Sequence, residues 1–201
     1  MSVPARASLL IVLSLWWPWA VNAAGSGPVA ADSDAAVTRL ITQAVSSRDA
    51  DLQAFYMARA MGSAWRDEQT VMAFAAAIAT LAEDGLVPSD YGPETLVAAY
   101  RKAHAAVPRA EALARFDIEV SGLLITVLHH LASGKVDPKA IDADWDLPRA
   151  VPQLDFVAVS QAVDTRQFEA AFAAARPAHG LYAGLRAGLA RYRDLERRGG
   201  W

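Results

Sequence analysis

The chain has 201 residues, of which 54% are hydrophobic and 20% charged, and it carries a net charge of −3 and no cysteine. The length suits a single domain with an appendage, and the hydrophobic content excludes a wholly disordered chain. The weakly negative charge is unlike the basic surface of a nucleic-acid binder, so no nucleic-acid partner is expected. The lack of cysteine excludes disulfide bonds, thiolate metal sites and a cysteine nucleophile.

Residues 1–23 are typical of a secretory signal peptide. Arg6 precedes an uncharged apolar stretch, residues 7–21, and Val21-Asn22-Ala23 supplies the residues of a cleavage site. The apolar stretch has about 15 residues, fewer than the roughly 20 of a membrane-spanning helix, and it contains Pro18. We therefore expect cleavage, a periplasmic location and no stable membrane span. The alternative is an uncleaved N-terminal anchor with interfacial Trp16, Trp17 and Trp19.

Residues 24–31 are expected to form a flexible N-terminus of the mature chain, and residues 32–201 an α-helical domain. In the latter, apolar residues recur at helical spacing, alanine is abundant, and no stretch alternates as a strand does. We therefore expect an all-α fold, an irregular multi-helix domain of about seven or eight helices.

The predicted helices begin and end at caps and helix breakers. Asp67 is suited to cap one helix and Gly85 to end it, whereas Pro93 and Pro108 are each suited to begin another. The proline-punctuated segment 135–152 is expected to be irregular. The remaining helices are predicted at residues 34–46, 51–61, 156–163, 165–175 and 180–197.

The predicted helices have apolar stripes, which are expected to be buried. The stripe of the longest helix, which begins at Pro108 and ends near Ala132, includes Leu113, Phe116, Val120, Leu123, Leu124, Val127 and Leu131. The stripe of the last helix consists of Leu181, Leu185, Leu189 and Tyr192, with arginines on the opposite face.

Three clusters of chemically active residues are too incomplete to predict a site. His129 and His130 are adjacent, so on a helix they point about 100° apart and are poorly placed to chelate one ion. The segment 142–146 resembles the start of a calcium loop, but Leu147 and Gln153 replace the required glycine and bidentate acid. Its Trp145 is expected in the core. Glu83-Asp84 would need a second carboxylate across a cleft to hydrolyse a glycoside.

The chain also lacks the motifs of elbow-type serine hydrolases, penicillin-binding serine nucleophiles, zinc proteases and phosphate-binding glycine loops. We expect no catalytic residue, no metal and no cofactor.

Three motifs, in order along about residues 55–201, resemble one family. The segment 82–91 (AEDGLVPSDY) is similar to the DGL-x-P-x-DY signature in the N-terminal scaffold region of large periplasmic L,D-transpeptidases. The segment 130–138 (HLASGKVDP) and the P-x-H-x-x-Y-x-x-L pattern from Pro177 are similar to two further stretches of that region. The matching residues are Asp84, Gly85, Leu86, Pro88, Asp90, Tyr91, Gly134, Pro138, Trp145, Pro177, His179, Tyr182, Leu185, Tyr192, Gly199, Gly200 and Trp201.

The resemblance implies a non-catalytic helical scaffold that positions a catalytic domain or a partner during peptidoglycan crosslinking or remodelling. The family's peptidoglycan-binding module and cysteine-dependent catalytic domain have no counterpart among these residues. The resemblance therefore does not imply transpeptidase activity for this chain. We expect a truncated or stand-alone scaffold whose partners are peptidoglycan or cell-wall synthesis proteins. The alternatives are a stand-alone binding module of the periplasm, a helical cell-wall hydrolase and the remnant of an interrupted gene.

Overall fold

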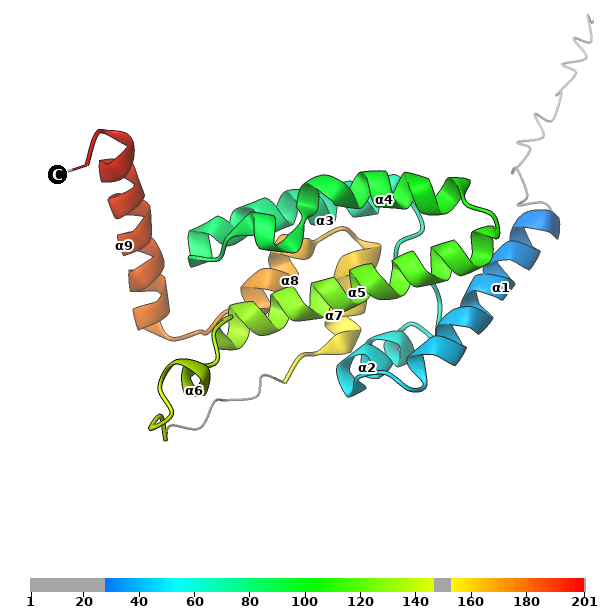
Figure 1. Cartoon of the computed structure of the whole chain (residues 1–201), viewed down its shortest axis with the longest axis horizontal. Helices are drawn as coiled ribbons and strands as arrows, with labels where there is room; N and C mark the ends of the chain where they lie inside the picture. Colours follow the sequence, from blue (N-terminus) through cyan, green and yellow to red (C-terminus); the bar gives the residue numbers. More distant parts are fainter. Residues whose placement is uncertain (1–27, 147–152, 201) are drawn as a thin grey trace, which may run out of the picture.

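The structure of the chain is a computed structural model that describes residues 28–146 and 153–200. The predicted signal peptide and Trp201 lie outside these residues. The described residues contain α-helices and two short 3-10 helices and no strand, which confirms the all-α fold (Figure 1). The elements are α1 (Pro28–Val45), α2 (Ala50–Ala58), α3 (Glu68–Thr80), η1 (Leu81–Asp84), η2 (Pro88–Tyr91), α4 (Pro93–Ala105), α5 (Arg109–Ser133), α6 (Pro138–Ile141), α7 (Phe156–Asp164), α8 (Phe168–Ala175) and α9 (Gly180–Arg197).

The long helix α5 lies at the centre of the fold and contacts α1, α2, α4 and α8. Most of its predicted apolar stripe is buried, including Phe116, Leu124 and Leu131. Aromatic side chains from α2, α3 and α8 fill the core beside it: Phe55, Tyr56, Phe74, Phe168 and Phe172. Burial of each such ring stabilises the fold by roughly 1.5–3 kcal/mol.

Local signals place several helix ends where the sequence predicts them. The carboxylate of Asp67 accepts a hydrogen bond from the backbone N–H of Thr70 at 2.8 Å and so caps α3. Gly85 ends η1 in the left-handed conformation, with φ of 79°, and Pro93 is the first residue of α4. The last helix spans the residues predicted for it.

Other details of the prediction are wrong. Helix α2 ends at Ala58 rather than residue 61, because Ala60 and Met61 adopt positive φ as the chain turns toward α3. Residues 28–31, assigned to a flexible N-terminus, belong to α1. Trp145 is 40% exposed rather than buried in the core.

Helix α9 differs most from the expectation, because none of its residues is buried. It stands at one end of the molecule, with α1 at the other end (Figure 1). Among the described helices, none contains a stretch that is both long enough and apolar enough to cross a membrane.

Candidate protein-interaction site

The first and third sequence motifs meet at the carboxylate of Asp84. Its side chain is 1% exposed, and it receives a bidentate pair of hydrogen bonds from Arg176, at 2.9 and 2.7 Å. The hydroxyl of Tyr182 donates a third hydrogen bond to it at 2.9 Å, and Arg186 Nε forms an ion pair at 2.8 Å. We call Asp84, Arg176, Tyr182 and Arg186 the Asp84 cluster. It joins η1 to α9 and to the segment that precedes α9.

The two arginines keep Asp84 ionised. Burial alone would raise the pKa of Asp84, but the hydrogen bonds from Arg176 and Tyr182, with the charges of Arg176 and Arg186, hold this pKa below its ordinary value. Burial, and then the hydrogen bond to this carboxylate, raise the pKa of Tyr182 to about 12. The cluster is therefore a set of fixed charges at neutral pH.

Further contacts orient the same side of α9 toward η1. Arg186 also pairs with Glu83 at 2.7 Å, and Arg193 donates a hydrogen bond to the backbone carbonyl of Ala82. Leu189 packs over Gly85, where an added Cβ would lie 3.7 Å from its side chain. These contacts fix the rotation of α9 about its own axis.

The first and second motifs also meet, at the C-terminal end of α5. Lys135 forms an ion pair with Asp90, and Tyr91 shares a hydrogen bond of 2.9 Å with His130 Nδ1. The ammonium of Lys135 lies 5.9 Å from the centre of the Tyr91 ring. The structure thus ties η2 to the end of α5, beside the Asp84 cluster on η1.

The remaining motif residues shape the backbone. Gly134 ends α5 and Gly199 and Gly200 follow α9, all with positive φ, whereas Pro88 and Pro138 begin short helices. His179 caps α9, since its Nδ1 accepts a hydrogen bond from the N–H of Leu181 at 3.1 Å. Leu86 packs at the edge of the core, and Pro177 precedes α9. Trp145 lies in the loop after α6.

The apolar stripe predicted to be buried on α9 is exposed. Leu181 and Leu185 are each 72% exposed and Tyr192 is 62% exposed, while Leu189 alone faces η1. The prediction fails because the Asp84 cluster turns Tyr182 and Arg186 toward the body of the molecule and leaves the leucines outside. We call Leu181, Leu185, Gly188, Tyr192 and Leu195 the α9 stripe. These exposed apolar side chains on one face of α9 make it a candidate protein-interaction surface.

A family model described as Scaffold domain matches residues 50–189. The chain belongs to the Scaffold domain family. The match covers most of the chain, from α2 into α9, and it supports a non-catalytic scaffold role. No curated protein and no solved structure matches the chain.

A second buried carboxylate in this Scaffold domain, that of Asp117 on α5, was not predicted from the sequence. Its oxygens accept hydrogen bonds from the hydroxyl of Tyr56 at 2.6 Å, from the hydroxyl of Ser63, and from the backbone N–H groups of Ala64 and Trp65 at 3.0 Å. Burial and the neighbouring Asp117 raise the pKa of Tyr56. The position of Asp117 within the apolar stripe of α5 is the sequence signal from which this buried carboxylate could have been predicted.

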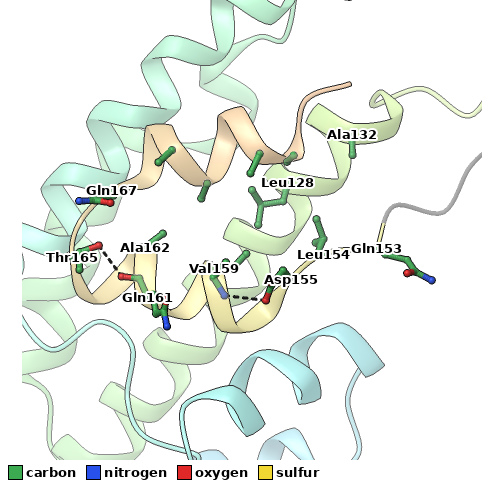
Figure 2. A pocket seen from close by; sticks show the side chains of 15 residues that line it. Leu128, Ala132, Gln153, Leu154, Asp155, Val159, Gln161, Ala162, Thr165 and Gln167 are labelled. Carbon is green, nitrogen blue, oxygen red and sulfur yellow. Dashed lines mark hydrogen bonds between the residues drawn. The ribbon is translucent and has the colours of Figure 1, made fainter. Parts of the chain in front are cut away.

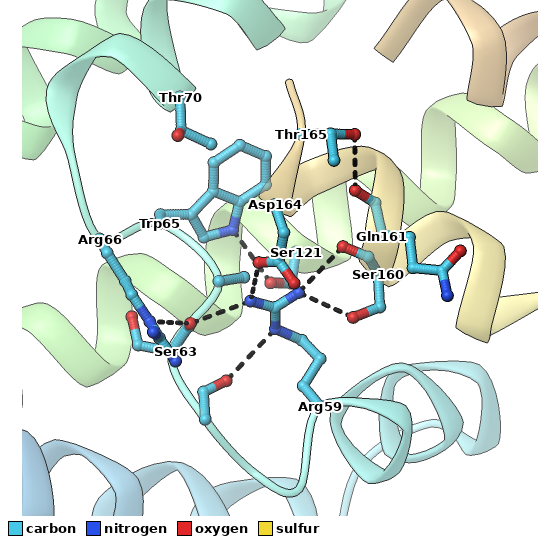
Figure 3. Close-up of polar contacts among 12 residues, drawn as sticks. Arg59, Ser63, Trp65, Arg66, Thr70, Ser121, Ser160, Gln161, Asp164 and Thr165 are labelled. Atoms are coloured by element: carbon cyan, nitrogen blue, oxygen red, sulfur yellow. Dashed lines mark hydrogen bonds and ion pairs between the residues drawn. The ribbon is translucent and has the colours of Figure 1, made fainter. Parts of the chain in front are cut away.

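Arg59 is a third polar centre, at the end of α2 (Figure 3). It donates hydrogen bonds to the backbone carbonyl and the hydroxyl of Ser160, at 3.2 and 2.9 Å, and to the carbonyl of Ser63 at 3.1 Å. It also pairs with Asp164 at 2.8 Å. The guanidinium therefore joins the loop after α2 to α7, and its role is structural.

The two adjacent histidines bind different partners. His129 Nε2 lies 2.6 Å from a carboxylate oxygen of Asp51, whereas His130 bonds to Tyr91. In the described part of the chain, no group of three or more His, Asp or Glu residues is arranged to hold a metal ion.

A cavity of about 440 Å³ lies between α5, α7 and α8 (Figure 2). Alanines, with Leu128, Leu154 and Val159, supply most of its lining. The carboxylate of Asp155 at its edge is already used, since it caps α7 through the N–H groups of Val157 and Ala158. The lining thus offers apolar surface and no pair of carboxylates for hydrolysis.

Proposed function

We propose that this Scaffold domain is the non-catalytic helical part of an L,D-transpeptidase-like system that crosslinks or remodels peptidoglycan in the periplasm. Its task is to present α9 in a fixed orientation, so that a catalytic domain or a partner protein is positioned over the cell wall. The observation that carries this proposal is the Asp84 cluster, in which residues of two separate motifs meet and hold α9.

The chemistry of the cluster supports a positioning role. A carboxylate held by two arginines and a tyrosine is bound in several directions at once, which orients the attached helix. The exposed apolar stripe then points away from the body, where a partner can reach it.

The same cluster argues against the hydrolase alternative at this position. A glycosidase needs a carboxylic acid with a raised pKa to protonate the leaving group. The arginines lower the pKa of Asp84, so this residue does not suit that role.

The experiment that tests the proposal measures peptidoglycan crosslinks in cells that encode the chain. Deletion of its gene is expected to lower the fraction of crosslinks made by L,D-transpeptidation. Wild-type protein and the control Glu119→Gln, altered at an exposed carboxylate on α5, are expected to restore that fraction. Asp84→Asn is expected to restore less of it at equal protein abundance. An unchanged crosslink fraction in the deletion strain would contradict the proposal.

A further inference from the structure

The α9 stripe has the spacing of a coiled-coil seam. Leu181, Leu185, Gly188, Tyr192 and Leu195 follow one another at intervals of four, three, four and three residues. Such a 4–3 alternation is the a/d pattern of the heptad repeat, in which one helix packs along another. With Leu185 and Tyr192 at a positions, Gly188 and Leu195 are at d positions.

Two glycines leave room on this face for another helix. Gly184 and Gly188 lie inside α9, where glycine is a poor helix former. No heavy atom lies within 4 Å of the place where either glycine would carry a Cβ, so the described part of the chain gives no packing reason for them. The absence of side chains at these positions permits close approach of a second backbone.

The charged residues beside the α9 stripe favour a second copy of the chain as the partner, with its helix parallel to the first. Arg191 is at a g position and Glu196, five residues later, at an e position, and neither forms an ion pair within the described residues. In a parallel two-stranded coil, residues at g and e of opposite helices pair across the seam. Arg191 of one copy therefore meets Glu196 of the other.

An antiparallel pair is disfavoured by the same charges. In that arrangement g positions face each other, which would bring Arg191 near the second copy's Arg198, a like charge.

The body of the molecule lies along part of one side of the seam, where Tyr182 and Leu189, at e positions, contact η1. Arg186 and Arg193, which also reach η1, are about 100–140° around the helix from Leu181 and Tyr192. The other flanking positions that the parallel arrangement uses, Gly184, Arg191 and Glu196, are exposed.

We infer that the α9 stripe is covered by a second copy of this chain, in a parallel two-stranded coil with Arg191–Glu196 pairs on both sides. Because the inference names the partner of the helix presented by the scaffold, it rests on the proposed function. Helix α9 spans 18 residues, about 27 Å, which is a short seam. The dimer is therefore reversible and dissociates on dilution.

Cysteine crosslinking of the purified chain tests the direction. The natural sequence contains no cysteine, so a disulfide reports only the introduced residue. Leu195→Cys, at a d position, places two thiols opposite each other in the parallel dimer and is expected to give a covalent dimer on mild oxidation. The control Met57→Cys, at an exposed position on α2, is expected to remain monomeric under the same conditions. Equal crosslinking of both variants would overturn the inference.

Sedimentation equilibrium of charge-reversal variants tests the Arg191–Glu196 ion pairs. Arg191→Glu and Glu196→Arg are each expected to weaken the dimer by roughly fivefold, and the double variant to regain most of the wild-type affinity. Leu185→Asp is expected to abolish the dimer, while its helix content, measured by circular dichroism, stays at the wild-type level.

Two results would overturn the inference: a wild-type chain that stays monomeric over the whole concentration range, or a double variant whose dimer is as weak as those of the single variants. If a chain that stays monomeric still supports L,D-crosslinking in cells, the dimer inference is wrong, whereas the proposed scaffold function is supported.

Discussion

Among single residues, Asp84 is expected to make a large contribution to stability. Asp84→Asn removes the charge that compensates Arg176 and Arg186, and Arg176 is itself largely buried. Breaking a buried ion pair on one side leaves the other charge uncompensated, so the free energy of unfolding is expected to fall by about 3 kcal/mol.

The effect of Asp84 depends on pH. Its pKa in the folded protein lies below the unfolded value of about 3.9, so its ionisation stabilises the fold above roughly pH 4. This stabilisation is lost as the pH falls through the folded pKa. Urea unfolding of wild type and Asp84→Asn should therefore differ most at pH 7 and converge as the pH falls below the folded pKa of Asp84. Glu119→Gln, at an exposed carboxylate on α5, is the control, and a difference that persists at low pH would contradict the assignment.

Asp117 provides a second prediction at the residue scale. Asp117→Asn replaces one acceptor oxygen by an amide N–H₂ among donors from Tyr56, Ser63 and two backbone N–H groups. One of these donors loses its acceptor in the core, so the free energy of unfolding is expected to fall by roughly 2–4 kcal/mol. Chemical denaturation measures the loss. Glu119→Gln, exposed on the same helix, is expected to change stability by less than about 0.5 kcal/mol.

At the scale of elements, the glycines of α9 and η1 should respond in opposite ways to alanine. Gly184→Ala and Gly188→Ala add a methyl group to open space inside a helix, so each is expected to raise the helix content of α9 and to stabilise it by about 0.5–1 kcal/mol. Gly85→Ala is expected to destabilise the protein, because its φ of 79° strains an alanine. Circular dichroism and thermal unfolding at a dilution that keeps the chain monomeric measure both effects. Equal effects at the three positions would contradict the interpretation.

Helix ends were predictable from the sequence where a local residue decides them. Asp67, Gly85 and Pro93 act on backbone groups within a few residues, and the structure places all three as expected. The end of α2 was not predictable, because it depends on Arg59, whose partners on α7 lie about one hundred residues away in the sequence.

The face that a helix buries was less predictable than its bounds. Periodicity alone assigned Leu181, Leu185 and Tyr192 to the core, since the leucines of a helix usually pack inward. The orientation of α9 depends instead on Arg186 and Tyr182, which reach Asp84 across the chain. The motifs identified Asp84 and Tyr182, but no spacing in the sequence indicated that these two residues are in contact.

At the scale of the whole molecule, α9 and the rest of the domain are expected to differ in stability. Helix α5 packs its buried stripe against several helices, whereas α9 contacts chiefly η1 and buries none of its residues. Elements with little buried apolar surface open locally at a lower free energy than the core does. We therefore expect α9 to unfold locally more often than α5 does, while its contacts with η1 set its orientation when it is folded.

Amide hydrogen exchange, followed by mass spectrometry on dilute monomeric protein, measures this difference. We expect the amides in the middle of α9 to exchange far faster than those in the middle of α5. Asp84→Asn should accelerate exchange in α9 more than in α5, because it removes the contact that anchors α9 to η1. Equal protection of α5 and α9 in the wild type would instead mean that the two helices unfold together. Raising the protein concentration should slow exchange along α9, since a second copy would then cover its stripe.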